Sequence, residues 1–171
     1  MPSEIEERLE GPPTSESVAA LALSKARAVA DRVAEGVVLG ADTVVVIDGV
    51  ALGKPVGVED ARGMLRRLRG RWHEVITGVA VVDAMSGRAE TTAVVTRVSM
   101  ADVGDDVIDA YVAGGEPLDK AGAYAIQGAG AALVAEFVGS YSNVVGLPLA
   151  ATAGLLRDFG VAVTSPALPF A

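Results

Sequence analysis

The sequence contains no cysteine and a single histidine. Without cysteine the chain can form no disulfide and offers no thiolate as a metal ligand or nucleophile. One histidine, His73, cannot supply a cluster of imidazole ligands, so we expect it to have a structural role. The lack of cysteine also fits a reducing compartment, and we therefore expect a cytoplasmic protein.

Long apolar runs and an excess of positive charge are also lacking. No stretch approaches the ~18 apolar residues of a membrane-spanning helix. Residues 1–13 are acidic and do not have the basic start and apolar core of a signal peptide. The formal net charge is −8. We therefore expect neither a membrane nor a nucleic-acid polymer as partner. A small anionic ligand is compatible with this charge, because a few cations can gather inside an acidic protein.

Several common catalytic signatures are absent from the 171 residues. There is no Walker-type loop, no G-x-G-x-x-G dinucleotide fingerprint and no G-x-S-x-G elbow, so Ser-His-Asp hydrolysis lacks its sequence marks. The length suits one domain, and the 51% of residues that are hydrophobic suffice for a core. We expect a single domain over residues 1–171.

Helical and strand patterns alternate along the chain. The predicted helices cover residues 11–36, 58–70 and 104–115, with a last one beginning near Leu147-Pro148. The predicted strands cover residues 37–47, 50–52, two segments within 73–100, 131–140 and 161–163. Asp48-Gly49 is typical of a hairpin turn. This alternation predicts an α/β fold in which helices cover the faces of a mixed sheet.

Asp42 interrupts the apolar run 37–47. A carboxylate inside a buried strand has a desolvation cost unless it is paired or bound to a cation. Two interpretations are open: a structural aspartate that accepts hydrogen bonds from nearby backbone, or a metal ligand or general base. The second is favoured. Asp48, in contrast, precedes a glycine in a turn, and we expect only a turn role for it.

Two further polar clusters could hold a ligand. Lys54 stands between a glycine and a proline, where it can serve as a point charge for phosphate, although many surface loops share this pattern. The loop 116–130 is rich in glycine and carries polar side chains, and the amide of Gln127 can both donate and accept hydrogen bonds to a base edge. A structured surface loop is the alternative for this segment. Its polar residues are Glu116, Asp119, Lys120, Tyr124 and Gln127.

Taken in order, these clusters belong to a known series. The series consists of "GADTVVVIDG", "LGKP", "HEVITGVAVVD", "YVAGGEPLDKAGAYAIQGAG" and "NVVGLPL". These segments closely resemble the motifs of the Maf family of nucleotide pyrophosphatases, and the resemblance covers residues 4 to 159. The resemblance implies a three-layer α/β/α fold with an elongated mixed sheet, related to the Ham1-type inosine triphosphate pyrophosphatases. It implies hydrolysis of nucleoside triphosphates to the monophosphate and pyrophosphate, and it implies a homodimer.

The resemblance also implies roles for individual residues. Asp42 matches the family's proton acceptor, and Lys25 and Lys54 match its phosphate-binding lysines. Lys120 is expected to bind phosphate as well. Glu7 matches an acidic residue and is expected to share a divalent cation, Mg²⁺ or Mn²⁺, with Asp42. Which of these two carboxylates deprotonates the attacking water stays open.

Two residues carry the implied substrate preference. In the branch of the family that acts on dTTP and UTP, the residue after the aspartate is threonine and the late loop carries I-Q-G. This chain has Thr43 and Gln127 at those positions. The resemblance therefore implies specificity for dTTP and UTP, and modified pyrimidine nucleotides are further candidate substrates.

Family members carry a strand, an S-x-S-P-R-R loop and a helix before the part matched here, so the resemblance implies a domain that lacks these elements at its N-terminus. Two explanations are open. A misassigned start codon, with a longer active protein in the cell, is favoured because the remaining site residues are present. In a true truncation, activity would be weak or absent. The alternative function is a non-catalytic nucleotide-binding or regulatory protein linked to septum formation.

Overall fold

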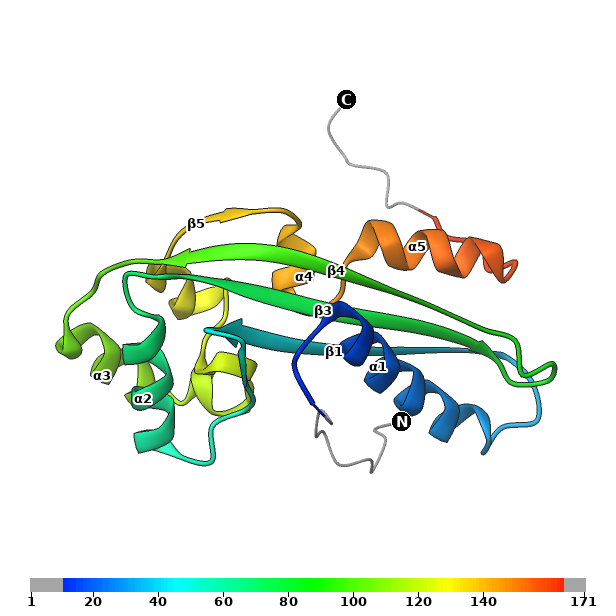
Figure 1. The fold of residues 1–171 in the computed structure, drawn as a ribbon, viewed down its shortest axis with the longest axis horizontal. Coiled ribbons are helices and arrows are strands. Elements are labelled where there is room, and N and C mark those ends of the chain that lie inside the picture. The colour runs from blue at the N-terminus through cyan, green and yellow to red at the C-terminus, as the bar shows by residue number, and fades with distance from the viewer. Residues whose placement is uncertain (1–10, 165–171) are drawn as a thin grey trace.

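The structure is a computed structural model that describes residues 11–164. Five strands in this part form one sheet in the order β2-β1-β3-β4-β5, with helices on both faces (Figure 1), so the predicted α/β fold is confirmed. The strands are β1 Val37–Ile47, β2 Val50–Leu52, β3 Trp72–Asp83, β4 Ala89–Met100 and β5 Val134–Val138. The α-helices are α1 Ser15–Ala30, α2 Val58–Leu68, α3 Asp105–Ala113, α4 Tyr141–Val145 and α5 Leu149–Asp158. Three 3₁₀ helices are η1 Glu116–Asp119, η2 Ala121–Ala123 and η3 Gly128–Leu133.

Every pairing between these strands is antiparallel, so the predicted mixed sheet is not found within residues 11–164. Tight hairpins explain two of the pairings, because a short turn can only join antiparallel strands. Asp48 and Gly49 between β1 and β2 have φ values of 54° and 72°, which suits the predicted two-residue turn. The short strand predicted at 161–163 is wrong: these residues form no regular structure.

Helix α1 lies against one face of the long strands, and two glycines allow its close approach. A Cβ atom on Gly78 of β3 would lie 2.5 Å from the carbonyl oxygen of Val18. A Cβ atom on Gly40 of β1 would lie 2.6 Å from the carbonyl oxygen of Ala22. Any larger residue at these two positions would push the helix away from the sheet.

The ends of α1 differ in how well the sequence predicts them. Thr14 caps the start, where its side chain accepts a hydrogen bond from the Ser17 N–H. The helix ends at Ala30, earlier than the predicted end at Gly36. Gly36 instead lies directly before β1, where its carbonyl accepts a hydrogen bond from the Ala84 N–H at 2.9 Å.

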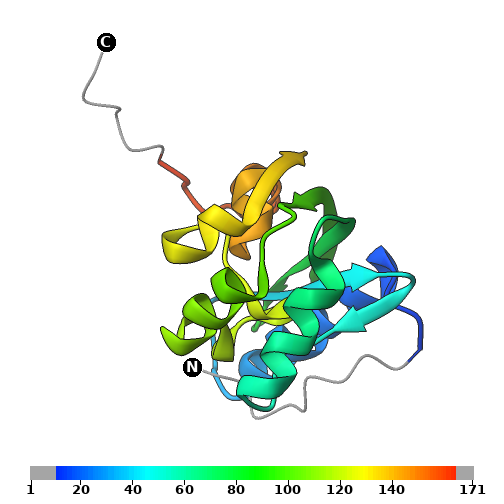
Figure 2. The ribbon, with the colours of Figure 1, turned by 90° about the vertical axis from the view of Figure 1, so that its left-hand side faces the viewer.

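The opposite face of the sheet carries the larger core. Alternate residues of β1 separate the two sides, as expected for a strand: Val44 packs with Val18 of α1, whereas Val45 joins a cluster that includes Leu65 of α2 and Ile108 of α3. Figure 2 looks onto this end, where α2, α3 and the 3₁₀ segments gather beside the strand ends. The core therefore holds the loop 116–130 against the second half of β1.

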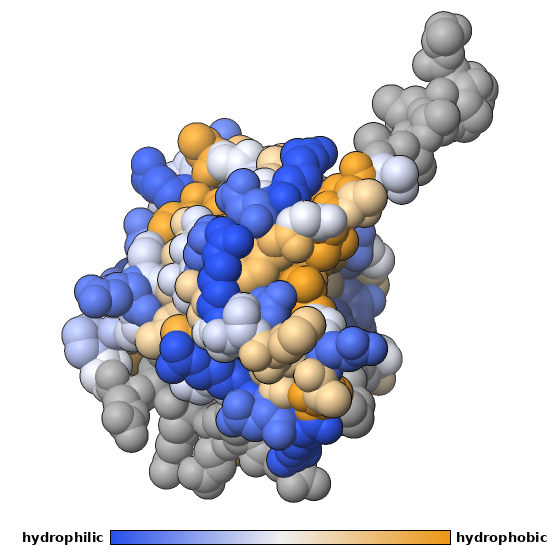
Figure 3. All heavy atoms as spheres, turned by 90° about the vertical axis from the view of Figure 1, so that its right-hand side faces the viewer, coloured by the Kyte–Doolittle hydropathy of each residue, from blue (hydrophilic) through white to orange (hydrophobic). Residues whose placement is uncertain are grey.

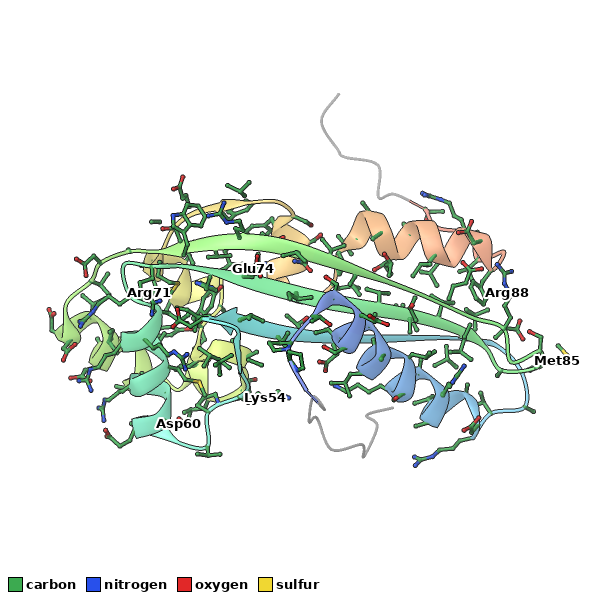
Figure 4. All side chains as sticks on the ribbon, viewed as in Figure 1. Lys54, Asp60, Arg71, Glu74, Met85 and Arg88 are labelled. Atoms are coloured by element: carbon green, nitrogen blue, oxygen red, sulfur yellow. The ribbon has the colours of Figure 1, made fainter. Side chains whose placement is uncertain are left out.

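The other end of the sheet carries the β3–β4 hairpin and α5. Arg88 joins them: its guanidinium lies 4.4 Å from the centroid of the Phe159 ring and donates a hydrogen bond to the Asp158 carbonyl at 3.1 Å (Figure 4). The surface at this end mixes apolar and charged side chains (Figure 3). Within residues 11–164, no helix has the length and apolar character that a membrane crossing requires.

Candidate active site

A cavity of about 410 Å³ is lined by residues of α1, β1, α4 and the loops around residues 54 and 119–127. The cavity lies beside an open edge of β1. Strand β2 pairs only with residues 45–47 of β1, and residues 37–44 pair with β3 alone among the described strands. Neighbouring residues of a strand point to opposite faces. Asp42 and Thr43 can therefore both line a cavity at this edge, one from each face. The polar lining consists of Lys25, Asp42, Thr43, Lys54, Asp119, Lys120 and Gln127.

Asp42 forms an ion pair with Lys25 of α1. The two side chains are only 9% and 12% exposed, so each charge offsets much of the desolvation cost of the other. Gly78 lies directly across from Asp42 in the β1–β3 register, and its missing side chain lets α1 approach closely enough for Lys25 to reach the carboxylate. The predicted catalytic carboxylate thus has a lysine partner, and both line the cavity.

Two more lysines line the same cavity. Lys120 donates a hydrogen bond to Asp119 at 2.6 Å. This bond and the charge of Lys120 lower the pKa of the Asp119 carboxyl, and the charge of Lys54 acts in the same direction. The Gly122 N–H donates to the Gly53 carbonyl at 3.0 Å, which ties the loop of Lys54 to that of Lys120. In Figure 4, Lys54 lies between α2 and α1, far from the hairpin tip.

Glu116 holds the loop that carries Gln127. Its carboxylate accepts hydrogen bonds from the backbone N–H groups of Ala129 at 3.2 Å and Gly130 at 3.3 Å, and from the Tyr111 hydroxyl at 3.2 Å. These bonds fix the chain directly after Gln127. From the sequence, Glu116 was only one polar residue of the loop. The sequence did contain a signal for this role. A glycine-rich backbone offers N–H groups, and a preceding carboxylate can accept hydrogen bonds from them.

Tyr124, in the cavity wall, is supported by the single histidine. The Tyr124 hydroxyl lies 2.7 Å from His73 Nε2, and the two rings meet edge to face at 5.4 Å. His73 is 4% exposed, and this burial lowers its pKa to about 4, which keeps the imidazole neutral at pH 7. Burial also raises the pKa of Tyr124. The histidine therefore has a structural place behind the site, in line with its predicted role.

The structure brings most of the predicted site residues together. Asp42, Lys25, Lys54, Lys120, Thr43 and Gln127 all line the one cavity. Glu7, predicted as a metal ligand, lies outside the described residues. The roles of all these residues in binding and chemistry stay predictions.

The donor set near Asp42 decides what kind of metal site is compatible. Among residues 11–164 there is no group of three or more His, Asp or Glu side chains that could hold an ion. Mg²⁺ commonly binds through one or two carboxylates and the phosphate oxygens of its substrate, and it keeps several waters. The cavity lining holds two carboxylates, Asp42 and Asp119, which is fewer than a protein-built cage needs. Asp42 therefore fits a cation that arrives with a phosphate ligand.

Comparison with known proteins identifies the family of the chain. A protein of Anaeromyxobacter dehalogenans (strain 2CP-C) named dTTP/UTP pyrophosphatase is 56% identical over 162 residues, which cover 93% of this chain and 81% of that relative. Proteins with the same name in Moorella thermoacetica and Dictyoglomus thermophilum are 55% and 48% identical, over 88% and 81% of this chain and 78% and 72% of their own. The model of the family described as Maf-like protein matches residues 1–159. The chain belongs to the Maf family.

Proposed function

We propose that the protein hydrolyses dTTP and UTP to the nucleoside monophosphate and pyrophosphate. The observation that carries the proposal is the gathering of Lys25, Lys54 and Lys120 with Asp42 in one cavity of about 410 Å³. This volume lies within the range of small-molecule sites. Relatives that are 48–56% identical bear the name dTTP/UTP pyrophosphatase, which supports the choice of substrate.

The three lysines address the main obstacle to the reaction. Anionic phosphate oxygens repel an incoming nucleophile, and ammonium groups placed around them offset that charge in the transition state. Asp42 is ion-paired with Lys25, one of these lysines, and it would accept the proton of the attacking water. A divalent cation held by Asp42, with Glu7 as the proposed second ligand, would add positive charge at the phosphates and favour ionisation of bound water.

Four further lining residues would select the base. Thr43 and Gln127 line the cavity together with the apolar side chains of Ile126 and Val145. An amide and a hydroxyl can each donate and accept hydrogen bonds, which suits a pyrimidine edge with both kinds of group.

Pyrophosphate release from UTP, dTTP, CTP, GTP and 7-methyl-GTP in the presence of Mg²⁺ tests the proposal. We expect UTP and dTTP to be cleaved fastest. Equal release from every nucleotide, or none, would contradict it. Binding of UTP without release would favour the non-catalytic alternative.

Asp42→Asn is the decisive variant. Loss of a general base lowers turnover by about 10²–10⁴-fold, and we expect a fall of this size with an unchanged circular dichroism spectrum. Asp48→Asn is the matched control, because Asp48 is an exposed turn residue at positive φ that asparagine tolerates. An active Asp42→Asn protein would remove Asp42 from the catalytic role.

A further inference from the structure

A buried polar network lies directly behind Thr43. Thr77 of β3, Thr96 of β4 and Asn143 of α4 are each 0% exposed. The Asn143 side-chain amide donates to the Thr96 hydroxyl at 2.9 Å and to a backbone carbonyl of β3 at 3.0 Å. The Thr77 hydroxyl donates to the Asn143 carbonyl at 3.1 Å. The network therefore fixes α4, whose end supplies residues 144–146 to the cavity wall.

The hydroxyls of Thr43 and Thr77 make three contacts of hydrogen-bonding length but have only two hydrogens to donate. Their Oγ1 atoms lie 2.8 Å apart, Thr77 Oγ1 is 3.1 Å from the Asn143 carbonyl, and Thr43 Oγ1 is 3.3 Å from the Gly146 carbonyl. Each hydroxyl can donate only one hydrogen bond, so two of these three contacts can be hydrogen-bonded at once. The two shortest are satisfied together when Thr77 donates to Asn143 and Thr43 donates to Thr77.

This arrangement decides what the cavity wall offers a ligand. With its hydrogen directed to Thr77, the Thr43 hydroxyl leaves the Gly146 carbonyl without that donor. Gly146 lines the cavity, and its carbonyl oxygen lies 3.3 Å from Thr43 Oγ1. A carbonyl oxygen has two lone pairs, and without the Thr43 donor both stay available to a ligand. Such a strong acceptor matches a ring N–H and opposes a ring nitrogen that carries a lone pair.

We propose that Thr77 is a positioning residue for base selection: it holds the Thr43 hydroxyl hydrogen away from Gly146, so that the Gly146 carbonyl accepts from the N3–H of uracil or thymine. Cytosine has a lone pair at N3 and would face this carbonyl unpaired, which is the costly case in a desolvated site. The inference rests on the proposed function and specifies how that site separates uracil and thymine from cytosine.

Thr77→Val tests the inference, because it removes the hydroxyl and keeps the shape. The Thr43 hydroxyl then has Gly146 as its remaining acceptor among the three contacts. We expect the ratio of kcat/KM for UTP to that for CTP to fall about 10-fold, mainly through KM for UTP. Thr77→Ser should restore the ratio. Thr152→Val is the matched control. The Thr152 hydroxyl is buried in α5, has no hydrogen-bond partner among residues 11–164 and lies outside the cavity lining.

A binding measurement separates this inference from the proposed function. Calorimetric titration with UMP and CMP needs no turnover, and we expect wild type to prefer UMP and Thr77→Val to lose about 10-fold of that preference. An inactive wild type that prefers UMP would contradict the pyrophosphatase proposal alone. A wild type without preference, or a folded Thr77→Val protein that retains the full preference, overturns the role of Thr77. If Thr77→Val does not fold, Thr77→Ala removes the same hydroxyl without adding volume.

Discussion

The ammonium of Lys25 and the carboxylate of Asp42 pair across the contact between α1 and β1, with 12% and 9% of their side chains exposed. Removal of one partner leaves the other charge buried, which typically costs about 3–5 kcal/mol. The pair therefore joins the chemistry of the site to the attachment of α1.

We expect Lys25→Met and Asp42→Asn each to lower the free energy of unfolding by about 3 kcal/mol. The double variant should lose less than the sum of the two, with a coupling of about 1–3 kcal/mol, because it removes both charges of this contact together. Urea unfolding of the four proteins measures the cycle. Additive losses would show that the two charges do not stabilise each other.

Gly78→Ala should detach α1 in part. Its new methyl group would lie 2.5 Å from the Val18 carbonyl oxygen, a backbone atom that cannot move alone. We expect a loss of about 3 kcal/mol, at the upper end for overpacking. Gly63→Ala is the control in α2, where a Cβ atom would meet none of the described residues within 4 Å. It should stabilise the protein by about 0.5–1 kcal/mol. Melting temperatures that move in the same direction would contradict the close packing at Gly78.

The single histidine makes the pH dependence of stability traceable. Burial lowers the His73 pKa from 6.5 to about 4, so the unfolded chain binds a proton that the folded chain does not bind between these values. The stability from this residue is complete above pH 6.5 and is lost as the pH falls towards 4. Between pH 7 and pH 5 the loss is about 2 kcal/mol.

His73→Gln can still hydrogen-bond Tyr124 but does not titrate, and it should lack this contribution. Urea unfolding at pH 7 and pH 5 gives the slope for both proteins. Equal slopes would show that His73 titrates normally in the folded protein.

Glu116→Gln should weaken substrate binding more than turnover. The amide keeps one acceptor oxygen but loses the charge that strengthens the bonds to the Ala129 and Gly130 N–H groups. We expect KM for UTP to rise about 10-fold, since a loss near 1.4 kcal/mol corresponds to that factor. Glu136→Gln, at an exposed position of β5, is the control and should leave KM unchanged. An unaltered KM for Glu116→Gln would mean that Gln127 does not depend on this clamp.

The strands were predictable because their signals are local. The run at β1 is rich in β-branched residues, and Asp48-Gly49 marks its turn, so bounds and hairpin are confirmed. Helix α4 was missed because its five residues are too short for a periodic pattern. The antiparallel sheet was missed because the pairing of β1 with β3 depends on packing between distant segments.

The candidate site also combines residues with local sequence signals and residues that only distant contacts bring together. Asp42, Lys54 and Gln127 stand out within short motifs, and the cavity brings them together. The network behind Thr43 could not be predicted, because Thr77 becomes its neighbour only through the β1–β3 register. Nothing local distinguishes Thr77 from other threonines of a strand.

The position of Asp42 and Thr43 on opposite faces of β1 has an evolutionary consequence. One peptide unit separates the side chain proposed for the reaction from the side chain proposed for selecting the base. The first pairs with Lys25 of α1, whereas the second contacts Gly146, directly after α4. We therefore expect a substitution at residue 43 to change the substrate preference without disturbing the carboxylate. Related enzymes could diversify their nucleotides in single steps while the hydrolytic centre stays intact.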